Sequence, residues 1–261
     1  MDYSDWAPRD VRALISAGKL QGQTSGMCAG YAQANLCILP KAQAFDFLLF
    51  CMRNPRPCPI LEVGEAGCRQ MGAMARGDDV CTAFPKYRIW RAGELVEEVT
   101  DISAYWQDDL VYFLIGCSFS FESELLQAGV PVRHIEEGRN VPMFNTNLAL
   151  EPAGVFHGNM VVSMRPIPHD LVVRSVQVTS RHAPRARRAC ADWRPGSHWH
   201  CRCALPGLRR QRDHSTGRGA GVLALWGNPS GSGDGGQGAL CHYPSPGHML
   251  ITDVPNTMLK Y

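Results

Sequence analysis

The chain lacks the features that would place a protein in or across a membrane. It contains no run of about 20 apolar residues, the length that a helix needs to span a bilayer. The first residues, Met1 to Trp6, are acidic and lead into no apolar signal core, so no secretory signal is visible. We therefore expect a cytoplasmic protein without a membrane partner.

One window lacks most core-forming residues. From His182 to Leu240 the chain has no Ile, Phe, Tyr, Met, Lys or Glu, yet it has nine Arg and eleven Gly. Ile, Phe and Met are among the residues most often fully buried, so such a window does not easily build a core. Its formal charge is +6, while the rest of the chain carries −4. We expect residues 182–243 to be irregular.

A dense cysteine framework is also missing. The eleven Cys are scattered along 261 residues, which fits reduced thiols better than the disulfide framework of a small secreted domain. Apolar residues make up 45% and charged residues 19% of the chain, which is ordinary for a globular protein. An enzyme or a binding protein is the expectation.

Outside the basic window, helical and strand patterns are mixed. Spacing predicts helices over residues 8–17, 42–51, 106–116, 122–128 and 170–178. Strands are predicted over 60–63, 130–135 and 158–164, with a hairpin over 87–99. This order predicts an α/β protein with mixed sheets and flanking helices, built as two intertwined subdomains.

Seven blocks of sequence, in order, resemble one enzyme family. They are Gly22–Gly26 with Gly30–Leu36, Phe50–Pro55 with Pro57–Pro59, Asp108–Leu110 with Leu114–Glu122, Arg133–Met143, Thr146–Asn147, Val161–Pro166, and Pro246–Met249 with Thr252–Asp253. In them the chain resembles the D-glutamate cyclase family, whose bacterial members are named hydro-lyases. The resemblance implies conversion of D-glutamate to 5-oxo-D-proline plus water, without a cofactor. It assigns residues 1–181 and 244–261 to one hydro-lyase domain.

The basic window interrupts this resemblance, and a shift of reading frame explains the interruption. Ala186 to Trp193 can be encoded so that the next frame reads His-Gly-Ala-Pro-Val-Gln-Ile, which is close to a family peptide. Ser197 to Cys201 and Arg218 to Gly231 recover family peptides with the same one-base offset. We therefore predict that residues 182–243 are an out-of-frame segment that replaces part of the family's core.

The implied reaction needs groups that move protons. Glu122 is a candidate acid or base, although a Glu at the start of a helix can simply complement the helix dipole. His134 and Glu136 would share one face of an extended strand, where they could transfer protons or form a surface ion pair. Cys117 is a fourth candidate, since a thiol beside a base becomes nucleophilic, but free Cys is usually a small buried hydrophobe. Catalysis is assigned to these four residues.

Guanidinium and amide groups are the candidates for substrate binding. A guanidinium can grip a carboxylate through two hydrogen bonds, and polar turns often carry function. The alternatives are capped helix ends, surface ion pairs and structural turns. The candidates are Arg53, Asn54, Arg139, Asn140, Thr146, Asn147, Arg165 and His248.

The basic window offers other functions, which we disfavour. His198, His200, Cys201 and Cys203 have poor spacing for structural zinc, so no metal is expected. The Arg-rich stretch over 181–218 lacks interleaved aromatics for base stacking, so no nucleic-acid partner is expected. The Gly-rich run over 231–236 lacks the GK[ST] of a phosphate loop.

Three functional classes remain open. The leading one is a hydro-lyase acting on a small amino acid or carboxylic acid. The second is a binding or regulatory protein that holds such an acid without turnover, and the third is an inactive product of a frameshifted gene. The sequence leaves open whether the protein forms a homo-oligomer.

Overall fold

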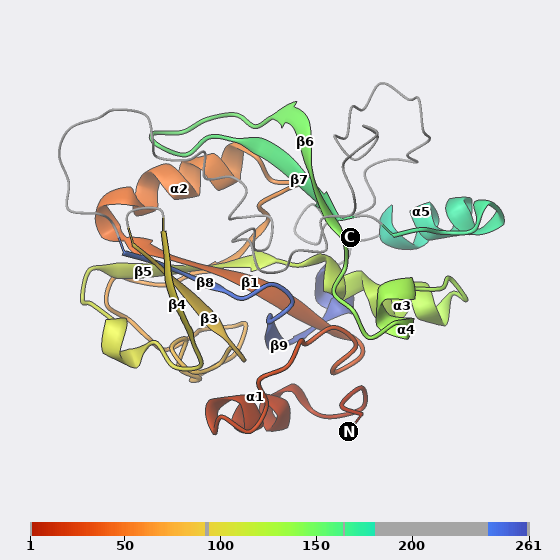
Figure 1. The fold of residues 1–261 in the computed structure, drawn as a ribbon, viewed down its shortest axis with the longest axis horizontal. Helices are drawn as coiled ribbons and strands as arrows, with labels where there is room; N and C mark the ends of the chain where they lie inside the picture. Colours follow the sequence, from red (N-terminus) through yellow and green to blue (C-terminus); the bar gives the residue numbers. More distant parts are fainter. Residues whose placement is uncertain (1, 92–93, 164, 181–239, 260–261) are drawn as a thin grey trace.

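The computed structural model describes residues 2–91, 94–163, 165–180 and 240–259 (Figure 1). The predicted out-of-frame segment lies outside the described residues except for its last four, which begin strand β8. The helices and strands are α1 (Pro8–Ser16), β1 (Tyr31–Pro40), α2 (Lys41–Arg53), β2 (Ile60–Val63), β3 (Tyr87–Arg91), β4 (Glu94–Val99), β5 (Leu110–Gly116), α3 (Glu122–Gln127), α4 (Arg133–Glu136), β6 (Met143–Ala149), β7 (Asn159–Ser163), α5 (Val172–Ser180), β8 (Leu240–Pro244) and β9 (Leu250–Pro255).

The mixture of helices and sheets confirms the predicted α/β class. A seven-stranded sheet has the order β2-β5-β1-β8-β3-β4, with β9 also paired to β1, and β6 and β7 form a separate two-stranded sheet. In the described part of the chain, no helix is long and apolar enough to cross a membrane. The seven cysteines whose side chains are described are thiols rather than disulfides.

The central strand β1 is buried on both faces, and each face supports its own core. Leu36 and Ile38 point into a cluster that includes Tyr87 and Leu114. The alternate residues, including Leu39, join a second cluster with Phe47 and Phe50 of α2. Because both faces are covered by protein, β1 has an almost continuous apolar run rather than strict alternation.

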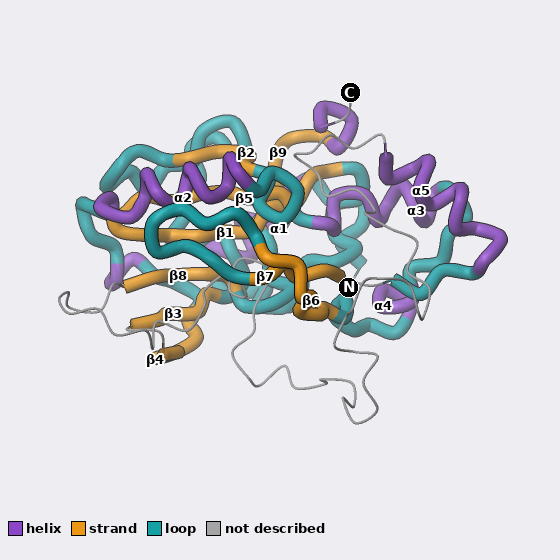
Figure 2. Tube along the Cα trace, turned by 90° about the horizontal axis from the view of Figure 1, so that it is seen from above, coloured by secondary structure: helices purple, strands orange, loops and turns teal. Residues whose placement is uncertain are grey.

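Helix α2 covers only part of its face of β1. Thirteen helical residues span about 20 Å, whereas ten strand residues span about 33 Å. The helix starts at Lys41, where β1 ends, so the N-terminal part of the strand extends beyond it. There the face carries Gln33 and Asn35. In Figures 1 and 2, β6 and β7 lie on the same side of the sheet as α2.

Two of the predicted elements are wrong. Residues 110–116 form β5 instead of a helix, because an apolar run buried on both faces of a sheet cannot be told from a buried helix by periodicity. Residues 133–136 form helix α4 instead of a strand, so His134 and Glu136 point in different directions. His134 is buried and Glu136 is exposed. The predicted helix over 42–51 and the hairpin over 87–99 are confirmed.

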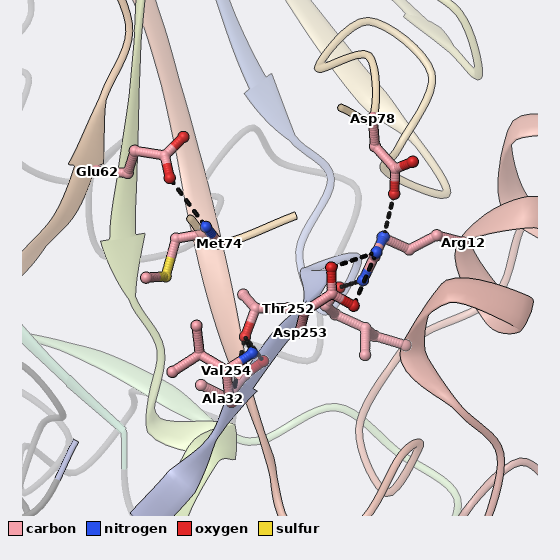
Figure 3. A network of polar contacts seen from close by, with 9 residues as sticks. Arg12, Ala32, Glu62, Met74, Asp78, Thr252, Asp253 and Val254 are labelled. Atoms are coloured by element: carbon pink, nitrogen blue, oxygen red, sulfur yellow. Dashed lines mark hydrogen bonds and ion pairs between the residues drawn. The ribbon is translucent and has the colours of Figure 1, made fainter. Parts of the chain in front are cut away.

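A buried arginine clasps the N-terminal helix to the sheet. Arg12 is 2% exposed and forms ion pairs with Asp78 and Asp253, as Figure 3 shows. One of its terminal nitrogens donates to the carbonyl of Ile251 at 2.8 Å. The clasp joins α1, β9 and the loop that precedes β3, so it has a structural role away from the pocket described below.

Candidate active site

A pocket lies on the face of β1 that α2 leaves uncovered. Its volume is about 30 Å³, room for about two water molecules. The polar residues that line it are Asn35, Cys117, Ser118, Asn140 and Ser163, and the apolar ones are Phe119, Val141, Met143, Val161 and Met249. An amino acid needs more space than this, so binding one requires the wall to open.

The strand register brings the first lining residues together. Asn35 of β1 is paired with Ile115 of β5. Cys117 follows Ile115 by two residues and so projects to the same face, since side chains alternate along a strand. Its backbone amide donates to the carbonyl of Gln33 at 3.2 Å, which continues the pairing beyond the end of β5.

A buried polar clasp joins the first and the last of the seven family-like blocks at the pocket edge. The hydroxyl of Thr24 donates to Oε1 of Gln33 at 2.8 Å, and Nε2 of Gln33 donates to the carbonyl of Thr24 at 2.8 Å. Thr24 also accepts a hydrogen bond from the amide of Met249, while its own amide donates to the carbonyl of Gly247. Residues distant in sequence are thus held beside one end of β1.

A charged cluster lies directly behind the pocket wall. Glu122, at the start of α3, is 2% exposed. Its Oε1 lies 2.9 Å from Nε2 of His134 and 2.5 Å from a terminal nitrogen of Arg165. The hydroxyl of Ser25 donates to Oε2 at 3.1 Å. One carboxylate therefore contacts side chains from three parts of the chain. They are His134 of α4, Arg165 after β7 and Ser25 after α1.

The surroundings of Glu122 keep it ionised. Burial by itself would raise the pKa of this carboxyl, but His134 and Arg165 outweigh burial and hold the pKa below its ordinary value. Glu122 is therefore a carboxylate at neutral pH. It can orient and stabilise the two basic side chains, but it has no proton of its own to donate there.

Arg165 connects this cluster to the pocket. Its guanidinium donates to the hydroxyl oxygens of Ser118 and Ser163, each at 3.2 Å, and it lies over the ring of Phe121. Both serines line the pocket. Because their oxygens accept from a cation, their own protons remain available to an acceptor inside the pocket.

His134 approaches the pocket through an aromatic side chain. Its ring is stacked on that of Phe119, with centroids 6.4 Å apart. Phe119 lines the pocket, whereas Glu122, His134 and Arg165 are not among the lining residues. Arg165 therefore acts on the pocket through the hydroxyls of Ser118 and Ser163.

Three other predicted binding residues have structural contacts outside the pocket. Asn54 exchanges hydrogen bonds with the backbone of Glu151, and Arg53 donates to the carbonyl of Pro152. Thr146 donates to the carbonyl of Met160 at 2.7 Å and so fixes the β6–β7 pair.

The remaining predicted residues are distributed around the pocket. Asn140 lines it, with its Oδ1 accepting from the amide of Val141. Arg139, like Glu136, is exposed. His248 is near the pocket edge, where burial lowers the pKa of its imidazole and Nδ1 lies 2.9 Å from the carbonyl of Pro246. The side chain of Asn147 and the cluster over 198–203 lie outside the described residues.

Sequence reasoning missed Asn35, Ser118 and Ser163 as site residues. A signal for the first was present, since Gln33 and Asn35 place amides in a strand that is otherwise apolar. Buried polar groups need partners, so such residues mark either a clasp or a binding site. Gln33 belongs to the clasp and Asn35 to the pocket.

Comparison with known proteins identifies the family. The profile of the D-glutamate cyclase family matches residues 111–193. Over 179 residues the chain is 63% identical to a Clostridium beijerinckii protein named "Putative hydro-lyase", which covers 69% of this chain and 68% of that protein. It is 62% identical over 175 residues to "Putative hydro-lyase YcsI" of Bacillus subtilis, with 67% and 68% covered.

One relative is similar over nearly the whole chain. "Putative hydro-lyase RBAM_004300" of Bacillus velezensis is 48% identical over 261 residues, which cover 98% of this chain and 97% of the relative. The matched region of the family profile contains Cys117, Ser118, Glu122, Asn140 and Arg165, which form the pocket wall and the cluster behind it. This chain therefore belongs to the D-glutamate cyclase family, a family of lyase-type enzymes.

Proposed function

We propose that the protein removes water from D-glutamate to form 5-oxo-D-proline. The α-amine nitrogen forms a bond to the side-chain carboxyl carbon, and one carbon–oxygen bond of that carboxyl group breaks. The oxygen leaves as water with two protons supplied by the ammonium group. Atoms and charge balance without an oxidant, a reductant or a second substrate.

The observation that carries the proposal is the pair of serine hydroxyls polarised by Arg165. Ser118 and Ser163 accept hydrogen bonds from the guanidinium and line the pocket, so each can donate to a substrate oxygen. Such donors stabilise negative charge that develops on a carboxyl oxygen during attack. Glu122 balances the charge of Arg165, which makes the site suitable for an oxygen that gains charge only in the transition state.

Proton transfer from the amine requires an acceptor inside the pocket. Cys117 is the titratable side chain among the described residues that line it, and we assign this role to its sulfur. Glu122 and His134 then act as positioning residues, because Arg165 and Phe119 lie between them and the pocket. Glu136 is exposed and takes no part in the proposed reaction.

The test is to incubate the purified protein with D-glutamate and, separately, with L-glutamate, and to measure 5-oxoproline by chiral chromatography. The proposal expects 5-oxo-D-proline from the D-enantiomer and much less product from the L-enantiomer. Saturable binding of D-glutamate without product would contradict it and favour a binding or regulatory role.

We also propose that residues 182–243 are encoded out of frame. Two relatives that are 62–63% identical align over about two thirds of the chain, whereas the relative aligned over 98% of it is 48% identical. Higher identity over the shorter alignments fits a segment inside the chain that differs from the family. Resequencing tests this proposal, and restoring the family frame should raise both activity and thermal stability. An uninterrupted read of the present frame, with peptide masses across 182–240, would rule out a sequencing error; unchanged activity after repair would argue against damage by a real frameshift.

A further inference from the structure

We propose that Asn35 is the residue that binds the substrate's amine. This inference rests on the proposed function, since it assigns a place to the amino group of the same substrate. It extends the function by naming the neutral amide oxygen Oδ1 of Asn35 as the hydrogen-bond acceptor. The ligand class is an amino acid rather than a simple dicarboxylic acid.

The first support is an unused acceptor. Asn35 is 2% exposed, and its Oδ1 accepts no hydrogen bond from the described part of the chain. Buried polar atoms are normally paired, so an unpaired acceptor calls for a partner that arrives from outside. Asn35 lines the pocket, so that partner can be a bound ligand.

The second support is the contrast with neighbouring amides. Gln33 lies two residues earlier on the same face of β1, and its amide is engaged at both ends by Thr24. Asn140 also lines the pocket, but its Oδ1 accepts from the amide of Val141. Of these three amides, Asn35 is the one whose Oδ1 accepts no hydrogen bond from the described residues, and it belongs to a residue that lines the pocket.

The third support is the charge of the pocket wall. None of the described residues that line it is Asp, Glu, Lys or Arg. A carboxylate beside an amine would favour the protonated ammonium form, which cannot attack a carbonyl carbon. A neutral amide oxygen can accept a hydrogen bond from an N–H of the amine. That bond orients the nitrogen and leaves the nitrogen's lone pair available for attack. The choice of Asn over Asp at this position suits a nucleophilic amine.

The layout of the pocket agrees with this role. Ser118 and Ser163 offer donors, which suit carboxyl oxygens, whereas Asn35 offers an acceptor, which suits nitrogen. Cys117 projects from the same sheet face as Asn35, two residues beyond its strand partner Ile115. An amine held by Asn35 would therefore be near the sulfur proposed to take its proton.

The experiment compares D-glutamate with glutarate, which has the same carbon chain without the amine. Wild type and the near-isosteric variant Asn35→Leu are assayed for kcat/KM with D-glutamate and for inhibition by glutarate. We expect kcat/KM to fall by on the order of 10- to 100-fold, the value of a hydrogen bond to a charged or polarised group. The inhibition constant of glutarate should stay within about twofold, because glutarate lacks the group that Asn35 binds.

A matched control and a second variant keep the test decisive. Asn256 is also buried, with an Oδ1 that accepts no hydrogen bond from the described residues, but it does not line this pocket, so Asn256→Leu should change neither constant. Asn35→Asp keeps an acceptor oxygen and adds a charge. This variant should still bind D-glutamate, but its kcat should rise at a higher pH than that of wild type. The reason is that the introduced carboxylate stabilises the ammonium form of the substrate.

The outcomes separate this inference from the proposed function. If wild type forms product and Asn35→Leu weakens both ligands equally, or neither, the Asn35 assignment is overturned while the function stands. If wild type forms no product, the proposed function fails, and calorimetry with both ligands decides on Asn35. Tighter binding of D-glutamate than of glutarate by wild type, lost in Asn35→Leu, would still support amine binding by Asn35. Equal binding of the two ligands by wild type would overturn it.

Discussion

Oε1 of Glu122 lies 2.9 Å from Nε2 of His134, with both side chains almost fully buried. The same oxygen lies 2.5 Å from Arg165, so one carboxylate stabilises two basic groups from different parts of the chain. A buried charge without its partner is costly. This relationship makes Glu122 important for the fold as well as for the pocket.

Glu122→Gln should lower the free energy of unfolding by about 3–5 kcal/mol, because it leaves the buried guanidinium of Arg165 without a counter-charge. Urea unfolding of both proteins measures the loss. Glu137→Gln is the control, since Glu137 pairs with Arg133 on the surface at 3.4 Å, and it should cost less than about 1 kcal/mol. Equal losses in the two variants would contradict a special role of the buried carboxylate.

The stability of the protein should depend on the ionisation of Glu122 at acid pH. Its folded-state pKa is lowered, so the unfolded chain binds more protons than the folded chain in this range. The stabilisation is present above the ordinary value of 4.5 and is lost as the pH falls through the folded-state pKa. The difference in unfolding free energy between wild type and Glu122→Gln should therefore be constant near neutral pH and shrink in acid. A difference that grows in acid would contradict this.

Ser118→Ala and Ser163→Ala should each lower the turnover of D-glutamate. Removal of one donor to a developing oxyanion costs roughly 100-fold in kcat in a well-formed site, and we expect at least about 10-fold here. Ser175→Ala is the matched control, because this buried serine donates to the carbonyl of Leu171, away from the pocket. Steady-state kinetics checks all three, and unchanged kcat in both pocket variants would refute the role of the serines.

Gly247→Ala should impair both stability and activity. Gly247 has φ +81°, and an added Cβ would lie 3.1 Å from Cγ of Gln23 and 3.3 Å from Cγ of Asn140. Gly138→Ala is the control, since Gly138 has φ +60° and no atom within 4 Å of the added carbon. The control should lose about 1–2 kcal/mol from backbone strain alone, with activity retained. Gly247→Ala should lose more and also raise KM; equal behaviour of the two variants in melting and kinetics would contradict the contact with Asn140.

Parts of the site were readable from local sequence. Glu122, His134 and Arg165 have ionisable side chains within blocks that resemble the family, and Cys117 and Asn140 lie beside them, so all five could be selected as candidates. Their functional roles could not be read. Glu122 was a candidate acid, yet His134 and Arg165 hold it as a carboxylate. A pKa depends on neighbours in space, which the sequence does not list.

Two secondary-structure predictions were wrong because the spacing of apolar residues did not distinguish a helix from a strand. The apolar run over 110–116 fits a buried helix as well as a strand that is covered on both faces. Residues 133–136 are too few to show a period, and their helical turn separates His134 from Glu136. Arg53 and Asn54 have the chemistry of carboxylate ligands, but they bind the backbone of residues 151–152 instead.

The sequence by itself determined the α/β class, the family and the chemical types of the candidate groups, because composition, spacing and family-like peptides are local properties. Only the tertiary structure decided which of these groups meet. The pairing of Asn35 with Ile115 and the reach of Arg165 to Ser118 join residues far apart in the chain. Such contacts depend on strand register and on how far α2 extends over β1, and these are set by the packing of the whole core.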